Sequence, residues 1–241
     1  MKASHSDQQA ILEVQRLDDQ LASLAQREAT LPESAALNTV VIKRNNVRDL
    51  RIAAETERTD VRRELSRAEG DVEQIMVRIQ RDEARLNSGT GTPKELEQTQ
   101  HELVTLGLRR SELEEAELAI MVTVEGISNR INELTAEEEK LAIEIADLEI
   151  KRENAMTIII NERNSVSEKR AATVAPIAQE LKDLYLKLAA DNNGNGAAPL
   201  VGNECKGCHL TINTTEVQRI TTLPAEEVVR CEQCRCILVR E

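Results

Sequence analysis

Apolar residues recur at alternating steps of three and four along most of the first 190 residues. The clearest run is a heptad stripe with one polar member, made of Val61, Leu65, Ala68, Val72, Ile75, Ile79, Asp82 and Leu86. This spacing places the stripe on one face of a helix, which is typical of a coiled coil. An earlier run from Val14 to Leu31 is followed by Pro32, so we expect a kink or short break there.

A second long helix is predicted after a turn at residues 87–93. The turn contains Gly89 and Gly91, and Thr92 with Pro93 suits the N-cap and first position of the next helix. The apolar stripe then continues through Ile120, Val124, Ile127, Ile131, Leu134, Leu141, Ile145 and Leu148. Pro176 should bend this helix. Because the turn is short, we expect the two helices to fold back on each other within one chain.

The distribution of charge supports an antiparallel pairing of these helices. Residues 43–67 carry a net charge of +3, whereas residues 114–139, which would lie opposite them, carry −7. Opposite charges on facing helices attract each other and help to select the register. With the tip near residue 90, the polar seam residue Glu138 is predicted to face Arg44.

The composition favours elongated helices over a globular core. The 241 residues include one tyrosine but neither phenylalanine nor tryptophan, although globular cores usually contain aromatic side chains. No apolar run is long enough to cross a bilayer, and the segment from Met1 to Asp7 has no signal-peptide pattern. We therefore expect a cytoplasmic protein that does not bind membranes. Residues 192–199 are rich in asparagine, glycine and alanine, which predicts a linker.

Four cysteines near the C-terminal end form two C-x-x-C pairs, Cys205 with Cys208 and Cys231 with Cys234. Each pair can direct two thiolates at one ion, and two pairs about twenty residues apart have the spacing of a structural zinc site. We therefore predict one structural Zn²⁺ per chain, bound by these four residues. Such a site has no open coordination position for catalysis.

Other uses of these cysteines fit less well. Cys205-Lys206-Gly207-Cys208-His209 also matches the attachment motif of c-type haem, but haem attachment requires export and leaves the second pair unexplained. Disulfides are unusual without an export signal, and a thioredoxin-type redox pair needs a βαβ context that is missing. We expect His209 to lie outside the filled coordination shell. Cys236 should behave as a small buried hydrophobe, with a role as a reactive thiol or alternative ligand as the second hypothesis.

Short strands are expected beside the cysteine pairs, at Leu210–Ile212, Glu227–Arg230 and Ile237–Val239. A module of about 45 residues buries too little apolar surface to fold unaided, so the metal should stabilise it. The expected fold is mainly α. It comprises a long antiparallel coiled-coil helical hairpin over residues 1–191, with its tip at about 87–93, a linker over 192–199, and a small β zinc ribbon over 200–241.

Several short motifs carry a resemblance to a known family. They are Pro93-Lys94-Glu95-Leu96 and Gln100-His101-Glu102-Leu103 after the tip, Leu184-Tyr185 before the linker, and the two cysteine pairs followed by Ile237-Leu238. In these motifs the chain resembles the bacterial C4-type zinc-ribbon proteins with an N-terminal coiled-coil hairpin, in particular actinobacterial members. The resemblance implies a non-enzymatic protein. Family members are described as candidate nucleic-acid binders, and some branches act in secretion and flagellar assembly through protein partners.

One departure from this family follows the last cysteine of the second pair. The family usually has glycine and then arginine there, whereas this chain has Arg235 and then Cys236. We therefore expect the backbone freedom of glycine to be lost at this point, and no arginine contact is carried over to position 236.

The sequence contains no nucleophile–base pair, phosphate-binding loop or open metal site, so neither an enzyme nor a small-molecule substrate is expected. We predict a non-enzymatic adaptor that binds a protein partner. The tip offers a contact surface made of Gly89, Gly91, Pro93, Lys94 and Glu95.

The alternative is a protein that binds DNA or RNA. It would use the basic residues of the ribbon, which are Lys206, Arg219, Arg230, Arg235 and Arg240. Against this alternative stand the net charge of −12 and the lack of aromatic side chains on which bases could stack. A hairpin on a four-cysteine module is also similar to factors that enter the RNA polymerase secondary channel, so an RNA polymerase binder is a third hypothesis.

Overall fold

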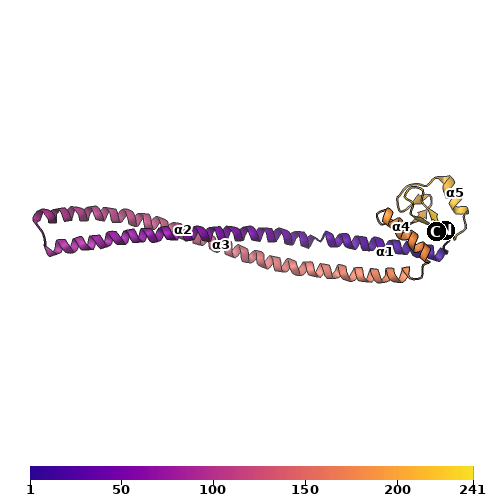
Figure 1. The fold of residues 1–241 in the computed structure, drawn as a ribbon, viewed down its shortest axis with the longest axis horizontal. Helices are drawn as coiled ribbons and strands as arrows, with labels where there is room; N and C mark the ends of the chain where they lie inside the picture. Colours follow the sequence, from indigo (N-terminus) through magenta and orange to yellow (C-terminus); the bar gives the residue numbers. More distant parts are fainter. Residues whose placement is uncertain (241) are drawn as a thin grey trace. The chain divides into compact units, whose positions relative to one another are not determined.

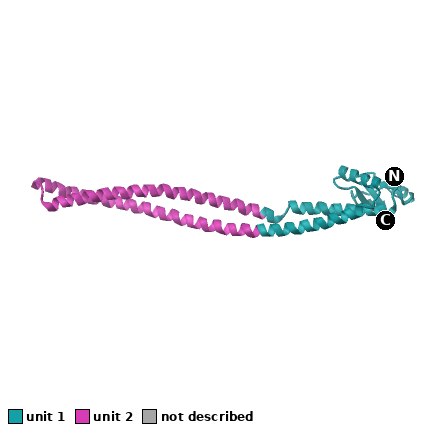
Figure 2. Cartoon of the chain, turned by 60° about the horizontal axis from the view of Figure 1, so that its bottom comes forward, with its two compact units in different colours: residues 1–35, 149–241 teal, residues 36–148 magenta. Residues whose placement is uncertain are grey.

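The computed structural model describes residues 1–240, most of which are helical. Helices α1–α5 span His5–Ala29, Pro32–Ser88, Pro93–Val174, Gln179–Asp191 and Thr214–Thr222, and strands β1–β4 span Ala197–Val201, Glu204–Cys205, Val229–Arg230 and Ile237–Arg240 (Figure 1). The chain divides into two compact units (Figure 2). We call residues 36–148 the hairpin unit, and residues 1–35 with 149–241 the ribbon unit. Within the described residues, no helix has an apolar stretch long enough to cross a membrane.

The hairpin unit is an antiparallel pair of helices, as predicted. The parts of α2 and α3 within it lie side by side and are joined by the loop between Ser88 and Pro93 (Figure 1). Ala54, Ile127 and Ile131 are buried together, and Val61 and Leu134 pack against them. These residues belong to the apolar stripes, so burial of the stripes explains why the two helices associate.

Two glycines and a capping box shape the tip. Gly89 has a φ of 63° and Gly91 a φ of 143°, backbone conformations that glycine adopts without a Cβ clash. The Glu95 carboxylate then accepts hydrogen bonds from the Thr92 amide at 2.7 Å and from the Thr92 hydroxyl at 3.0 Å. These bonds lower the pKa of Glu95. Glu95 was expected to contact a partner, but its carboxylate instead caps the N-terminal end of α3.

The partner of Glu138 differs from the prediction, although the neighbouring Lys43–Glu137 ion pair at 3.1 Å fits the predicted register. Glu138 pairs with Arg51, whose Nε lies 2.9 Å from Glu138 Oε2, and not with Arg44. Arg51 is one heptad further along α2 than Arg44. The prediction assumed that the two helices are mirror images about the tip. Arg51 instead reaches Glu138 from one heptad away, close in sequence to the buried residue Ala54.

Helices end at both predicted proline interruptions. α1 stops at Ala29 and α2 begins at Pro32, which confirms the expected break. α3 stops at Val174 and α4 begins at Gln179, so Pro176 separates two helices where only a bend was expected. A proline lacks the amide that an intrahelical hydrogen bond requires, and the chain turns here before a new helix starts.

The ribbon unit contains a four-stranded sheet in the order β2-β1-β4-β3. β1 is parallel to β4 and antiparallel to β2, and β3 is antiparallel to β4. Residues 197–199, expected to lie in a linker, instead begin β1, with Ala197 and Ala198 buried. Leu210–Ile212, expected to be a strand, takes part only in an isolated bridge. The short helix α5 between the two cysteine pairs was not predicted.

One apolar core joins the sheet to the helices of the ribbon unit. Ile237 and Val239 of β4 pack in it with Ile11 and Val14 of α1 and with Leu181 of α4. Residues 192–199 were expected to form a linker between the hairpin and the ribbon. The sheet and the helices of the ribbon unit instead bury apolar side chains in a shared core.

The N-terminal residues are attached to the same sheet. The Ala3 amide donates a hydrogen bond to the Glu226 carbonyl at 2.8 Å, and the Val228 amide donates to the Met1 carbonyl at 3.1 Å. The Gln8 side chain is buried and donates to the Ala3 carbonyl at 3.0 Å. The first and last parts of the chain therefore fold together.

The Arg51–Glu138 pair gives a test of the hairpin register. Both side chains are about three-quarters buried, so removing either one leaves its partner without a charge-assisted bond. In a double-mutant cycle on Arg51→Ala and Glu138→Ala, measured by urea denaturation, we expect the two effects to be non-additive. The same cycle on Arg44→Ala and Glu138→Ala is the control and should be additive. Coupling in the Arg44 cycle alone would support the register predicted from the sequence.

Candidate metal centre

The four cysteines of the predicted zinc site lie together in the ribbon unit. The Sγ atoms of Cys205, Cys208, Cys231 and Cys234 are all within 4.8 Å of one another. The Sγ distance is 3.8 Å from Cys205 to Cys234 and 3.9 Å from Cys208 to Cys231. This group of thiols could bind one metal ion.

The backbone forms a tight turn at each cysteine pair. The His209 amide donates to the Cys205 carbonyl at 2.8 Å, and the Arg235 amide donates to the Cys231 carbonyl at 2.9 Å. Each turn thus ends on the residue after its second cysteine, and both residues are left-handed, with φ of 56° at His209 and 63° at Arg235. Arg235 therefore keeps the conformation that we expected to be lost without glycine, and its Cβ makes that conformation strained.

Burial opposes ionisation of the thiols. Desolvation raises the pKa of Cys205, Cys208 and Cys234. Burial opposes ionisation of Cys231 as well, but hydrogen bonds from the Cys234 and Gln233 amides outweigh it and lower the pKa of Cys231. Since a metal binds thiolates, it must displace protons from these groups, and its affinity should fall as the pH falls.

Two residues next to the centre behave as expected from the sequence. The His209 side chain is exposed and its Nδ1 lies 3.4 Å from Glu204 Oε1, so it faces a carboxylate at the surface. Cys236 is fully buried, and burial raises the pKa of its thiol. Its Sγ is nevertheless only 3.2 Å from that of Cys234.

Most of the basic residues considered for nucleic-acid binding already have partners. Lys206 pairs with Glu204 at 2.8 Å, and Arg219 pairs with Glu216 at 2.5 Å. Arg240 is engaged most strongly, because its two Nη atoms donate to five backbone carbonyls, those of Ile220, Leu223, Pro224, Ala225 and Glu227. Arg240 therefore holds the backbone between α5 and β3, and these donors are not free to bind phosphate. Arg230 and Arg235 are exposed, and no ion pair involves them within residues 1–240.

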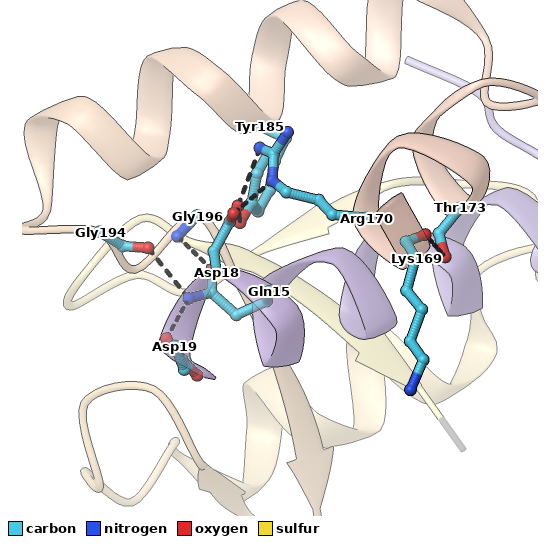
Figure 3. Close-up of polar contacts among 9 residues, drawn as sticks. All are labelled: Gln15, Asp18, Asp19, Lys169, Arg170, Thr173, Tyr185, Gly194 and Gly196. Carbon is cyan, nitrogen blue, oxygen red and sulfur yellow. Dashed lines mark hydrogen bonds and ion pairs between the residues drawn. The ribbon is translucent and has the colours of Figure 1, made fainter. Parts of the chain in front are cut away.

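Polar side chains of α1 fix the neighbouring segments, a role that no motif in the sequence predicted. The Gln15 side chain donates to the Gly194 carbonyl at 2.9 Å and accepts from the Gly196 amide at 2.8 Å (Figure 3). It also accepts from the Ala197 amide at 3.1 Å. It therefore holds the start of β1 in place. The only available signal was a regular spacing, since Gln8 and Gln15 are one heptad apart on α1.

A second polar cluster lies beside it. The Tyr185 hydroxyl donates to Asp18 Oδ2 at 2.7 Å, and Arg170 binds the same carboxylate with Nε and Nη2 (Figure 3). Burial and the hydrogen bond to Asp18 raise the pKa of Tyr185. One carboxylate thus ties α1, α3 and α4 together within the ribbon unit.

Comparison with known proteins identifies the family to which this chain belongs. The family model of the CT398-like coiled coil hairpin domain matches residues 14–193, which include most of α1 and all of α2–α4. The chain belongs to this family. The Mycobacterium tuberculosis protein Rv2229c is 32% identical over 244 residues, an alignment that covers 100% of this chain and 98% of that protein.

Two solved structures are also similar to this chain. A structure from Mycobacterium smegmatis has 31% identity and a TM-score of 0.89, with 100% of both chains covered. CT398 from Chlamydia trachomatis has 18% identity and a TM-score of 0.73, with 98% of both chains covered, a likeness that shows the fold alone. The mycobacterial relatives agree with the actinobacterial resemblance. The CT398-like match ends at residue 193, so the cysteine cluster lies outside it.

The shared core predicts how metal loss affects the ribbon unit. Removing metal from the loaded centre should loosen β4 and, through the core residues Ile237 and Val239, also loosen α1 and α4. Hydrogen exchange followed by mass spectrometry should then show reduced protection in α1 and α4 after chelation. Peptides from the seam of the hairpin unit around Ala54 and Ile131 are the internal control and should keep their protection. Loss confined to residues 200–240 would mean that the ribbon unfolds independently.

Backbone strain at Arg235 gives a second prediction. Because its φ of 63° favours glycine, Arg235→Gly should raise the stability of the metal-loaded protein, by about 0.5–1 kcal/mol after the entropy of the unfolded chain is included. The measurement is denaturant unfolding of the metal-loaded protein. Arg230→Gly is the matched control, because Arg230 is an exposed residue of strand β3, where glycine weakens the strand. A loss of stability in both variants would contradict the strain argument.

Proposed function

We propose that the chain is a non-enzymatic, zinc-binding adaptor whose partner is a protein. A tetrahedral site with Zn–S bonds of ~2.3 Å has S–S edges of about 3.8 Å. The Cys205–Cys234 and Cys208–Cys231 distances of 3.8 and 3.9 Å match this edge. Four thiolates would fill the zinc shell, so the ion would stabilise the fold and not catalyse a reaction. A reducing compartment such as the cytoplasm suits five free cysteines.

The ribbon surface supports a protein partner over nucleic acid. Phosphate binding needs several free cationic groups, but Lys206, Arg219 and Arg240 bind groups of their own chain. Arg230 and Arg235 remain as candidates for contact with phosphate. Two exposed arginines on an acidic chain would support only weak, salt-sensitive binding.

The observation that carries the proposal is an exposed apolar face on α3 of the hairpin unit. We call it the outer face and define it by Val104, Leu108, Leu118 and Val122, which are 60–69% exposed. Leu106 is buried, and a position two residues away, such as Leu108, points to the opposite side of the helix. The outer face therefore repeats at helical spacing without taking part in the hairpin seam, as a docking surface would.

The charges on and beside the outer face favour a partner helix that carries basic residues. Glu115 lies on this face between Leu108 and Leu118, and Glu112 and Glu114 lie at its two edges, about 80° to either side of its centre. Arg109 and Arg110 pair with two of these acids, but both ion pairs are at the surface, where such pairs are weak. We propose that the partner provides an amphipathic helix with basic residues between two apolar groups, which would complement this surface.

The test starts with partners captured from a nuclease-treated lysate and is decided with a purified partner. We expect the double substitution Leu108→Asp and Leu118→Asp to weaken binding at least about tenfold in calorimetry, since apolar anchors dominate such interfaces. The matched control is Ile143→Asp, which changes a 73% exposed isoleucine elsewhere on α3 in the same unit and should leave the affinity unchanged. Equal loss in both variants would contradict docking on the outer face.

Two further measurements distinguish other occupants. Sedimentation equilibrium would detect a second copy of the chain as a dimer that Leu108→Asp dissociates. Fluorescence anisotropy with labelled DNA and RNA would measure nucleic-acid affinity against salt. Tight, salt-dependent binding that is lost in Arg230→Ala with Arg235→Ala, but kept in the Leu108 and Leu118 variant, would overturn the protein-adaptor proposal.

A further inference from the structure

A fifth thiol lies at the cysteine centre, outside the group of four. Cys236 Sγ is 3.8 Å from Cys205 Sγ, the same distance that separates Cys234 from Cys205. The Sγ atoms of Cys234 and Cys236 are 3.2 Å apart. Two thiols therefore lie at the same distance from Cys205 and beside each other.

These distances suit a choice between two ligands. A tetrahedral Zn–S site has edges of about 3.8 Å, and both Cys234 and Cys236 stand at this distance from Cys205. The separation of 3.2 Å between them is shorter than an edge, so the two sulfurs do not suit two vertices of one tetrahedron. Cys236 is not among the four thiols that lie within 4.8 Å of one another, so its Sγ has to move toward Cys208 or Cys231 to replace Cys234.

The backbone holds Cys236 in this place. Arg235 is left-handed, with a φ of 63°, which turns the chain after Cys234. The Cys231 amide then donates to the Cys236 carbonyl at 3.0 Å, so the backbone of Cys236 is tied to the second cysteine pair. The position of the side chain thus follows from the local fold.

The first cysteine pair makes room for the same sulfur. A Cβ on Gly207 would lie 3.4 Å from Cys236 Sγ and 3.0 Å from Ala198 Cβ. The contact with Ala198 would be tight, whereas the distance to the sulfur is that of an ordinary van der Waals contact. Cys236 Sγ therefore packs directly against the turn between Cys205 and Cys208. A metal ligand from the second pair has to reach the same region.

We propose that Cys236 is an alternative metal ligand that takes the vertex of Cys234 when that thiol is blocked or absent. This inference rests on the proposed metal site and adds a residue to it. Cys236 is completely buried, whereas Cys234 is partly exposed and accessible to reagents in solution. A buried replacement would keep the ion bound and the ribbon folded after chemical modification of Cys234.

Metal stoichiometry and cobalt spectra of cysteine variants test this proposal. Full-length protein is loaded with Zn²⁺ for elemental analysis and with Co²⁺, whose charge-transfer absorption reports the number of bound thiolates. We expect Cys236→Ser and Cys234→Ser each to retain one ion per chain with a four-thiolate spectrum. The double variant should lose affinity by more than the roughly 10–100-fold that follows loss of an outer-shell partner.

Cys231→Ser is the matched control, because no spare thiol lies at its vertex among the described residues. It should lose affinity as the double variant does. If Cys234→Ser binds metal as poorly as Cys231→Ser, or with three thiolates, the alternative-ligand proposal is wrong while the metal site stands. A wild-type chain that binds no metal would contradict both. Far-UV circular dichroism of each variant shows that the helices remain folded, and Cys234→Ala repeats the test without a hydroxyl.

Discussion

Burial of strand β4 on both faces is the constraint on which the ribbon unit depends. Successive side chains of a strand point to opposite sides. Ile237 and Val239 accordingly enter the core with α1 and α4, while Cys236 and Leu238 enter the core around the cysteines. A strand of four residues thus belongs to two cores. The geometry of the thiols and the seating of the helices are therefore coupled, because a shift of this strand disturbs both.

The parts of the fold that could be predicted have local signals. The heptad stripe shows which faces of α2 and α3 are buried, and the C-x-x-C spacing shows which four thiols lie together. β1 has no such signal. Its sequence follows a run of asparagine and glycine, and Pro199 argues against a central strand. Its conformation comes from parallel pairing with β4, in which Pro199 lies opposite Val239, forty residues away.

Polar partners were the second part that the sequence could not provide. Gln15, Asp18 and Arg170 are ordinary residues of charged helices, and nothing close to them in the sequence distinguishes them from solvated neighbours. Their roles come from segments far along the chain, since Gln15 binds the backbone of Gly194 and Gly196. The wrong partner predicted for Glu138 has the same origin. Charge indicated which helices pair, but it did not show which of two arginines one heptad apart would bind Glu138, and the structure has Arg51 there.

Attachment of the first residues to the last strands also sets an order of synthesis. α1 leaves the ribosome early, but the strand that completes its core is translated more than two hundred residues later, on the order of ten seconds or more afterwards. The hairpin unit is complete once residue 148 has emerged, and its helices need only each other. Leu24 can pack on Ile159 of α3 earlier, but the core around Ile11 and Val14 stays incomplete on the nascent chain until the final strand supplies Ile237 and Val239.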